Sequence, residues 1–175
     1  LEECTPTEKA QLGLWRMIGE MLGESKRLHP TAVKYQHAAY QRQAAQRLIS
    51  MLDDYGGAML CDGVGLGKTY VATTLMVHYA NAWRDQWAAS PDRLVEEPLR
   101  ITVIAPHSVV STWRREAIPG LAAFGVSQAT VRVVSHAQLS RMVRVSELLE
   151  PVNGGLSDLE HLLLSDLVIV DEAHN

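Results

Sequence analysis

Cysteine is scarce in this 175-residue sequence: Cys4 and Cys61 are the only two, and they stand far apart. Neither belongs to a C-x-x-C pair, so the sequence predicts neither a disulfide framework nor a zinc site. Basic residues are also few, since 16 Lys and Arg against 20 Asp and Glu give a net charge of -4. This charge argues against a protein that coats nucleic acid through a global positive field, but not against a motor with a few local contacts.

Long apolar runs are absent as well. No run approaches the roughly 18 residues that span a bilayer, and no signal peptide, repeat or low-complexity segment is visible. We therefore expect a cytoplasmic protein, nucleoid-associated if bacterial, with no membrane partner. The composition, 47% hydrophobic and 21% charged, is that of an ordinary globular domain. Because the sequence starts at Leu1 and stops just after "VIVDEAHN", we expect it to be a piece of a longer protein.

Helical and strand patterns alternate along the chain. Helices are expected at 7–28, 35–53, 68–87, 109–117, 136–145 and 157–164, and strands at 57–61, 101–105, 130–134 and 166–172. The run "ITVIA" at 101–105 is almost wholly apolar and β-branched, which is typical of a strand buried on both faces. The alternation predicts an α/β fold with a parallel sheet covered by helices on both faces. Residues 1–34 are expected to form an N-terminal accessory helical segment, and residues 35–175 one lobe.

The stretch "LCDGVGLGKTYVA" places three glycines within five residues, between an apolar run and a helix. Glycine is costly inside regular structure, so the pattern indicates a backbone that must approach something closely. Strand, glycine loop and helix together are typical of a P-loop, whose N–H groups converge on phosphate oxygens at a helix N-terminus. The strict pattern has Gly where this chain has Asp62, and a plain glycine turn before a core helix is the alternative.

A P-loop assigns a role to each residue around the glycines. Lys68 would reach the β- and γ-phosphates, and the Thr69 hydroxyl would ligate Mg²⁺. The residues expected to bind the nucleotide here are Gly63, Gly65, Leu66, Gly67, Lys68, Thr69 and Tyr70.

Two acidic residues end the last apolar run, "DLVIVDE". A bound triphosphate needs its metal held from a second side, which Asp171 could do through the hydration shell of Mg²⁺. Glu172 would orient and deprotonate the attacking water. Two acids at the end of a strand can also be plain surface residues, but the P-loop upstream favours a catalytic role.

"GLGKT" and "DEAH" together resemble the first RecA-like lobe of superfamily 2 helicases and translocases. The wording "CDGVGLGKT" is most similar to the Swi/Snf-like ATPases, which also carry an acidic residue where Asp62 stands. The resemblance covers roughly residues 35–175 and implies a P-loop ATP hydrolase that uses ATP and Mg²⁺. By the same resemblance, His174 would couple the nucleotide site to a second lobe, although a terminal-strand histidine is more often structural.

Three further segments fit this resemblance. "YQRQAA" is similar to the family's upstream glutamine motif, so Gln41 would read adenine; Gln36 is the less favoured rival. "VIAPHSVVSTWRREA" resembles motif Ia, which touches the nucleic-acid backbone, and Pro106, His107, Ser108 and Trp113 match it. "VVSHAQL" resembles the next strand-binding segment, with Ser135 at its tip. Hydroxyls are common phosphate contacts, but Ser108 and Ser135 can equally be ordinary loop or cap residues.

The resemblance implies the ATP-binding lobe of a nucleic-acid-dependent ATPase, and a translocase on duplex DNA is favoured. The alternatives are a strand-separating DEAH-type DNA or RNA helicase and a nucleotide-gated module of a defence or restriction-type assembly. In superfamily 2 motors a second RecA-like lobe supplies arginine fingers, which are worth on the order of 10³ to 10⁵ in rate in phosphoryl transfer. Since that lobe is missing here, we expect the isolated chain to bind nucleotide weakly and to hydrolyse it negligibly.

Overall fold

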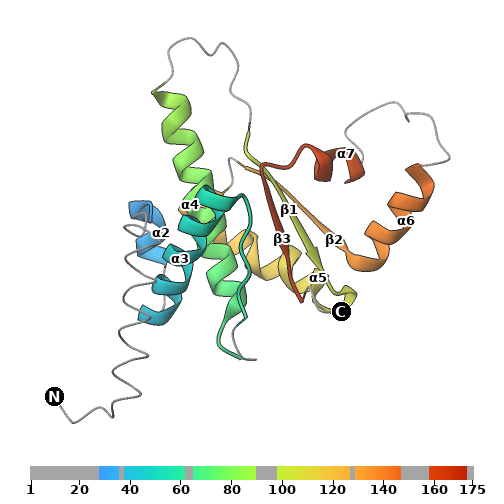
Figure 1. The fold of residues 1–175 in the computed structure, drawn as a ribbon, viewed down its shortest axis with the longest axis horizontal. Helices are drawn as coiled ribbons and strands as arrows, with labels where there is room; N and C mark the ends of the chain where they lie inside the picture. The colour runs from blue at the N-terminus through green and yellow to red at the C-terminus, as the bar shows by residue number, and fades with distance from the viewer. Residues whose placement is uncertain are drawn as a thin grey trace.

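Helices and strands alternate in a computed structural model of the chain, which describes residues 28–35, 38–61, 65–89, 98–126, 129–146 and 158–172. The order of elements confirms an α/β fold (Figure 1). The elements are α2 (Pro30–Tyr35), α3 (Ala39–Tyr55), α4 (Lys68–Ala88), β1 (Arg100–Ala105), α5 (His107–Thr112), the π-helical turn η1 (Trp113–Ala117), the 3-10 turn η2 (Pro119–Phe124), β2 (Thr130–Ser135), α6 (His136–Ser146), α7 (Asp158–Leu163) and β3 (Leu167–Val170).

Three parallel strands form the sheet, in the order β2-β1-β3. Ile101 of β1 is paired with Val131 on one side and with Leu167 on the other, and both neighbours run in the same direction as β1. The central strand is buried from Ile101 to Ala105, as its apolar sequence predicts. Parallel pairing needs a crossover between successive strands, and helices provide it here.

Helices cover the sheet on both sides (Figure 1). Side chains alternate between the two faces of a strand, so Ile101 and Val103 share one face and join the core to which α3 and α4 contribute. Thr102 lies on the opposite face, where its hydroxyl is 3.0 Å from Nδ1 of His161 in α7. The predicted parallel sheet with helices on both faces is therefore present in a small, three-stranded form.

The segment 57–61 was expected to be a strand, and that prediction is wrong. It runs from the end of α3 towards α4 without joining the sheet (Figure 1), and Met59 is 73% exposed. A strand is stable only where a neighbour accepts and donates its backbone hydrogen bonds. In the described part of the chain β3 pairs only with β1, so no strand lies beside the 57–61 segment.

Prolines begin two of the elements. Pro30 begins α2, because its missing N–H and fixed φ suit a first helical position. The helix predicted at 109–117 is present as α5 followed by the π-helical turn η1, which ends at Ala117, and Pro119 starts η2. The helix predicted at 7–28 lies outside the described residues, apart from Leu28.

Residues at the proposed N-terminal boundary pack into the same core as the sheet. Leu28 and Ala32 are buried in the cluster that contains Ile49 and Met76. The boundary between residues 34 and 35 remains a prediction. No helix within the described ranges has the length and apolar character that crossing a bilayer requires.

Two histidines hold α2 against α4. Nδ1 of His78 accepts the backbone N–H of His29 at 2.9 Å, and Nδ1 of His29 accepts the N–H of Thr31 at 3.1 Å. Nε2 of His29 is 2.9 Å from the Asp85 carboxylate. An imidazole nitrogen can accept these bonds only while it carries no proton.

Burial lowers the pKa of His78, the nearby Asp53 carboxylate opposes this shift, and the electrostatic effect of His29 adds a smaller lowering. The pKa in the folded state is therefore below the ordinary value of the unfolded chain. At a pH between the folded-state pKa and the unfolded-state pKa of His78, the unfolded chain binds more protons than the folded one. The contribution of His78 to stability is therefore fully present above the ordinary histidine pKa and is lost as the pH falls below it.

We predict a lower melting temperature at about pH 5.5 than at about pH 7.5, which lie on either side of the ordinary histidine pKa. His78→Asn should flatten this dependence, because the amide oxygen keeps an acceptor near the place of Nδ1 but does not titrate. Thermal unfolding followed by circular dichroism gives the melting temperatures of the wild type and of His78→Asn at the two pH values. Burial also lowers the pKa of His161, so the melting temperature of His78→Asn should still depend weakly on pH. If the dependence on pH is as steep in His78→Asn as in the wild type, the role of His78 is contradicted.

Candidate functional site

The residues that follow the three strands come together at one edge of the sheet. Because the strands are parallel, Pro106 after β1, Ser135 at the end of β2 and Asp171 after β3 all lie at their carboxyl ends. Figure 1 shows the start of α4 at the same end of the molecule. In open parallel sheets this edge is where ligands bind. Asp171 thus lies at the carboxyl edge of the sheet, towards the end of the molecule at which α4 starts.

The start of α4 has the backbone geometry of an anion site. Gly65 and Gly67 have φ values of 83° and 74°, in the left-handed region that favours glycine. Gly67 is the residue before α4, and no side chain caps the helix there. The first N–H groups of a helix have no partner within it, so this end attracts a negatively charged group. Gly63 lies outside the described residues.

The predicted nucleotide residues around the loop are accessible. Leu66 is 45% exposed and Tyr70 is 49% exposed. Thr69 is exposed in the first turn of α4, and Lys68 is partly buried beside it.

Gln41 of α3 packs directly on the glycine loop. Its side chain is buried, and its Nε2 atom lies 2.6 Å from the place where a Cβ on Gly67 would stand. Its other amide atom, Oε1, is buried and has no hydrogen-bond partner. Buried polar groups are almost always paired, so this amide oxygen beside the glycine loop is an acceptor open to a donor from a bound ligand or a water. The rival Gln36 lies outside the described residues.

Tyr40 was not identified from the sequence as a site residue. Its hydroxyl donates to the backbone carbonyl of Leu66 at 3.1 Å, and Nε2 of Gln41 donates to the hydroxyl at 3.4 Å. The only sign of this role in the sequence is that an aromatic residue directly precedes Gln41. The contacts of the Tyr40 hydroxyl could not be predicted, because they depend on how α3 packs against the loop.

Trp113 holds the first of the two acidic residues. Its indole is 2% exposed, and its N–H donates to Oδ2 of Asp171 at 3.0 Å. The backbone N–H of Asp171 donates to the carbonyl of Ile104 at 2.8 Å, which extends the ladder by one bond beyond Val170. Trp113 was quoted for the resemblance to motif Ia, but its contact with an acid 58 residues away was not foreseen.

Glu172 explains why β3 is shorter than the predicted strand 166–172. It is exposed, and its φ of 52° is in the left-handed region, which a non-glycine residue rarely adopts. The chain turns there and the strand ends at Val170. Such backbone conformations are enriched at functional sites. His174 lies outside the described residues.

The residues proposed to contact nucleic acid differ in exposure. His107 and Ser108 are exposed at the start of α5, and Pro106 before them is partly buried. Ser135 is 1% exposed, and its hydroxyl accepts the N–H of Gln138 at 3.1 Å while its own N–H donates to the Gln138 side chain. Ser135 therefore caps α6, which was the alternative interpretation.

The donor set fits a nucleotide-bound magnesium ion. Among the described residues no three His, Cys, Asp or Glu side chains gather into a metal cage. Mg²⁺ at a phosphate site does not need such a cage, because phosphates and waters supply most of its ligands. Thr69 and Asp171, the two residues predicted to hold the ion, carry a hydroxyl and a carboxylate, which are hard oxygen donors of the kind that Mg²⁺ prefers.

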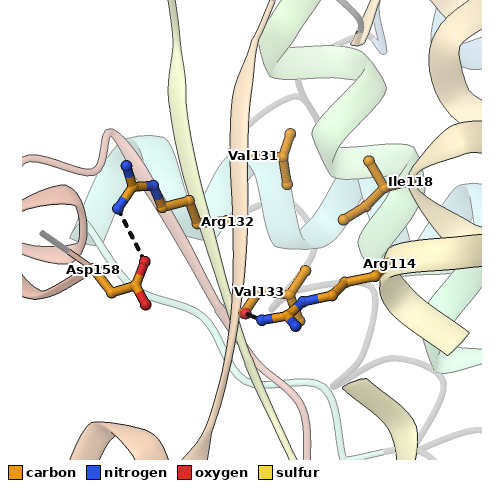
Figure 2. A pocket seen from close by; sticks show the side chains of 6 residues that line it. All are labelled: Arg114, Ile118, Val131, Arg132, Val133 and Asp158. Atoms are coloured by element: carbon orange, nitrogen blue, oxygen red, sulfur yellow. Dashed lines mark hydrogen bonds and ion pairs between the residues drawn. The ribbon is translucent and has the colours of Figure 1, made fainter. Parts of the chain in front are cut away.

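A hollow of about 350 Å³ lies at the outer edge of β2 (Figure 2). Arg114 donates to the backbone carbonyl of Val133 at 2.5 Å, and Arg132 is paired with Asp158 at 2.9 Å. The guanidinium groups of Arg114 and Arg132 are thus both paired with acceptors within the protein. Since an exposed strand edge invites unwanted pairing, Arg114 has a structural role in blocking it, and we do not add this hollow to the site.

No known family model matches the chain, and no curated protein is significantly similar to it.

Gly67→Ala tests whether the glycine is required at this position. The left-handed φ and the approach of Gln41 predict a loss of about 1–2 kcal/mol in the free energy of unfolding. Gly57→Ala is the matched control, because its Cβ would meet nothing within 4 Å and its φ is not left-handed. Chemical denaturation measures both variants, and equal stability of the two would contradict the geometry of the loop.

Proposed function

We propose that the chain is the ATP-binding first RecA-like lobe of a nucleic-acid-dependent ATPase, most similar in type to a Swi/Snf-like translocase on duplex DNA. The observation that carries the proposal is the contact between Gln41 and Gly67. A buried amide with an unpaired oxygen lies on a left-handed glycine at a helix start, and this is an arrangement that a purine nucleotide would complete.

Each part of the nucleotide has a counterpart at the carboxyl edge of the sheet. The N-terminus of α4 and the Lys68 amine would receive the phosphates, and the Gln41 amide would receive the base. Bound Mg²⁺ would neutralise charge that develops on the phosphates. Thr69 and Asp171 would hold the ion, and Glu172, exposed at the turn after β3, would take a proton from the attacking water.

A nucleic-acid partner is supported by the connection between β1 and η1. His107 and Ser108 are exposed at the carboxyl edge, where a phosphate backbone could contact them. The same connection continues into Trp113, which is hydrogen-bonded to Asp171. A contact at the start of α5 would therefore be transmitted to the carboxylate that holds the metal. This arrangement favours a motor, because a motor must couple its grip on nucleic acid to the state of the nucleotide.

Replacing Glu172 by Gln distinguishes a motor from a nucleotide-gated module. In the natural full-length protein, Glu172→Gln should lower ATP turnover by about 10²- to 10⁴-fold while ATP binding persists. Lys68→Ala is the matched control, because it should weaken binding itself. Turnover with duplex DNA, single-stranded DNA and RNA is measured in parallel. Full biological activity of Glu172→Gln would exclude a motor, and stimulation by RNA alone would favour an RNA helicase.

Trp113→Phe tests how Asp171 is positioned. Phenylalanine keeps a buried aromatic ring but lacks the N–H that Asp171 accepts. A hydrogen bond to a charged group is worth about 1.5–3 kcal/mol, so the Mg²⁺-dependent part of ADP affinity should fall roughly tenfold. ADP binding without Mg²⁺ serves as the internal control and should not change. An equal loss with and without the metal would show that the indole supports the fold alone.

A further inference from the structure

We propose that His161 forms an acid-sensitive clasp: its neutral imidazole holds α7 on the sheet, and its protonation releases α7 from β1. The clasp consists of three side chains, Thr102 of β1, His161 of α7 and Ser165 of the connection to β3. It lies on the face of the sheet opposite to the core that contains Ile101 and Val103. The inference is therefore independent of the proposed function.

The attachment of α7 to the sheet depends on this histidine. Among the six residues of α7, His161 is the only one that is buried, whereas Leu163 at the end of the helix is 74% exposed. Asp158 in the first turn is paired with Arg132 of β2, but both side chains are partly exposed, and such pairs contribute little to stability. A helix this short is not stable alone in water, so α7 needs the clasp to stay folded.

The donors and acceptors of the clasp allow one arrangement only. A hydroxyl group has a single hydrogen, and Ser165 gives its hydrogen to the backbone carbonyl of His161 at 2.7 Å. The Ser165 oxygen can then only accept, so the Thr102 hydroxyl, 2.7 Å away, must donate to it. The Thr102 oxygen consequently accepts from Nδ1 of His161 at 3.0 Å. The imidazole therefore carries its hydrogen on Nδ1.

The other ring nitrogen, Nε2, is left without a hydrogen while the imidazole is neutral. It is buried and has no hydrogen-bond partner in the part of the chain that the structure describes. A proton added to Nε2 would create a buried positive charge, which is costly unless the charge is paired. The clasp thus fits the neutral form of His161 and not the charged form.

The charged groups around the imidazole do not offset this cost. Arg132 in β2 and Arg100 in β1 repel a positive charge on it, whereas Asp158 attracts the charge but is already paired with Arg132. Helix α6 also contacts α7. Of its titratable and charged groups, His136 is partly buried, and Arg141 is exposed and donates to a carbonyl of its own helix. Neither of these two groups supplies a negative charge.

These surroundings give the clasp its dependence on pH. Burial lowers the pKa of His161, Arg132 adds to this lowering, and the backbone of Thr130 opposes it only in part. When α7 is released, His161 regains its ordinary pKa. At a pH between the two values the released state binds more protons, so α7 is fully attached above the ordinary histidine pKa and is released as the pH falls below it.

Amide hydrogen exchange of the full chain, followed by mass spectrometry, measures how often α7 is released. The comparison is made at about pH 7.5 and about pH 5.5, with correction for the effect of pH on the chemical exchange rate. Protection of the α7 peptide should fall by up to about tenfold at the lower pH, since that pH lies about one unit below the ordinary histidine pKa.

His161→Asn separates the clasp from other effects of acid. The asparagine amide can donate to Thr102 in place of Nδ1 but does not titrate, so protection of α7 should be equal at the two pH values. His78→Asn is the matched control, because it makes the same change in a partly buried histidine of α4. In His78→Asn the fall in α7 protection should remain.

The position of the imidazole hydrogen is measured on the wild type itself, so this test stands even if His161→Asn fails to fold. Long-range proton–nitrogen correlations by NMR distinguish the two neutral forms of histidine. At about pH 7.5, above the ordinary histidine pKa, His161 should carry its hydrogen on Nδ1 and none on Nε2.

Three results would overturn the inference. A hydrogen on Nε2 and not on Nδ1 would contradict the chain of donors through Thr102 and Ser165. Equal protection of α7 at both pH values in the wild type would show that acid does not release the helix. A fall in protection that persists in His161→Asn, or disappears in His78→Asn, would place the acid-sensitive group elsewhere.

Discussion

Parallel pairing on both sides of β1 is the constraint on which the rest of this structure depends. It sends the carboxyl ends of β1, β2 and β3 to one edge and requires helices to carry the chain back across the sheet. All the residues that follow the strands are brought to that edge as a consequence, including Pro106, Ser135 and Asp171. The glycine loop and Gln41 follow none of these strands, so their positions depend in addition on the packing of α3 beside α4.

Polar contacts between neighbouring segments then fix individual side chains at this edge. Trp113, whose indole donates to Asp171, stands where the helix after β1 changes from α to π geometry. π-helical turns often occur at functional sites, where they change the direction of a side chain. Tyr40 and Gln41 reach the glycine loop because α3 packs beside α4. In each case one buried or half-buried aromatic residue connects two segments that are far apart in the sequence.

Elements with a strong local pattern were predicted well. The helix from Lys68 and the strands at 101–105 and 130–134 have the expected bounds to within one residue, because continuous apolar or 3.6-residue patterns leave little choice. The segment 57–61 has an apolar pattern too, yet it is no strand, since strand formation requires a partner and not only a sequence.

The sequence by itself determined the fold class, the glycine loop and the position of the two acids, because each depends on the order and type of neighbouring residues. The absence of a Cβ permits the left-handed φ values that Gly65 and Gly67 adopt. The hydrogen bond from Trp113 to Asp171, the cap that Ser135 makes, and the close approach of the Gln41 amide to Gly67 were decided only by the tertiary structure. Their partners come from different elements or from side-chain rotamers, so the distances depend on how helices and strands pack and not on their separation in sequence.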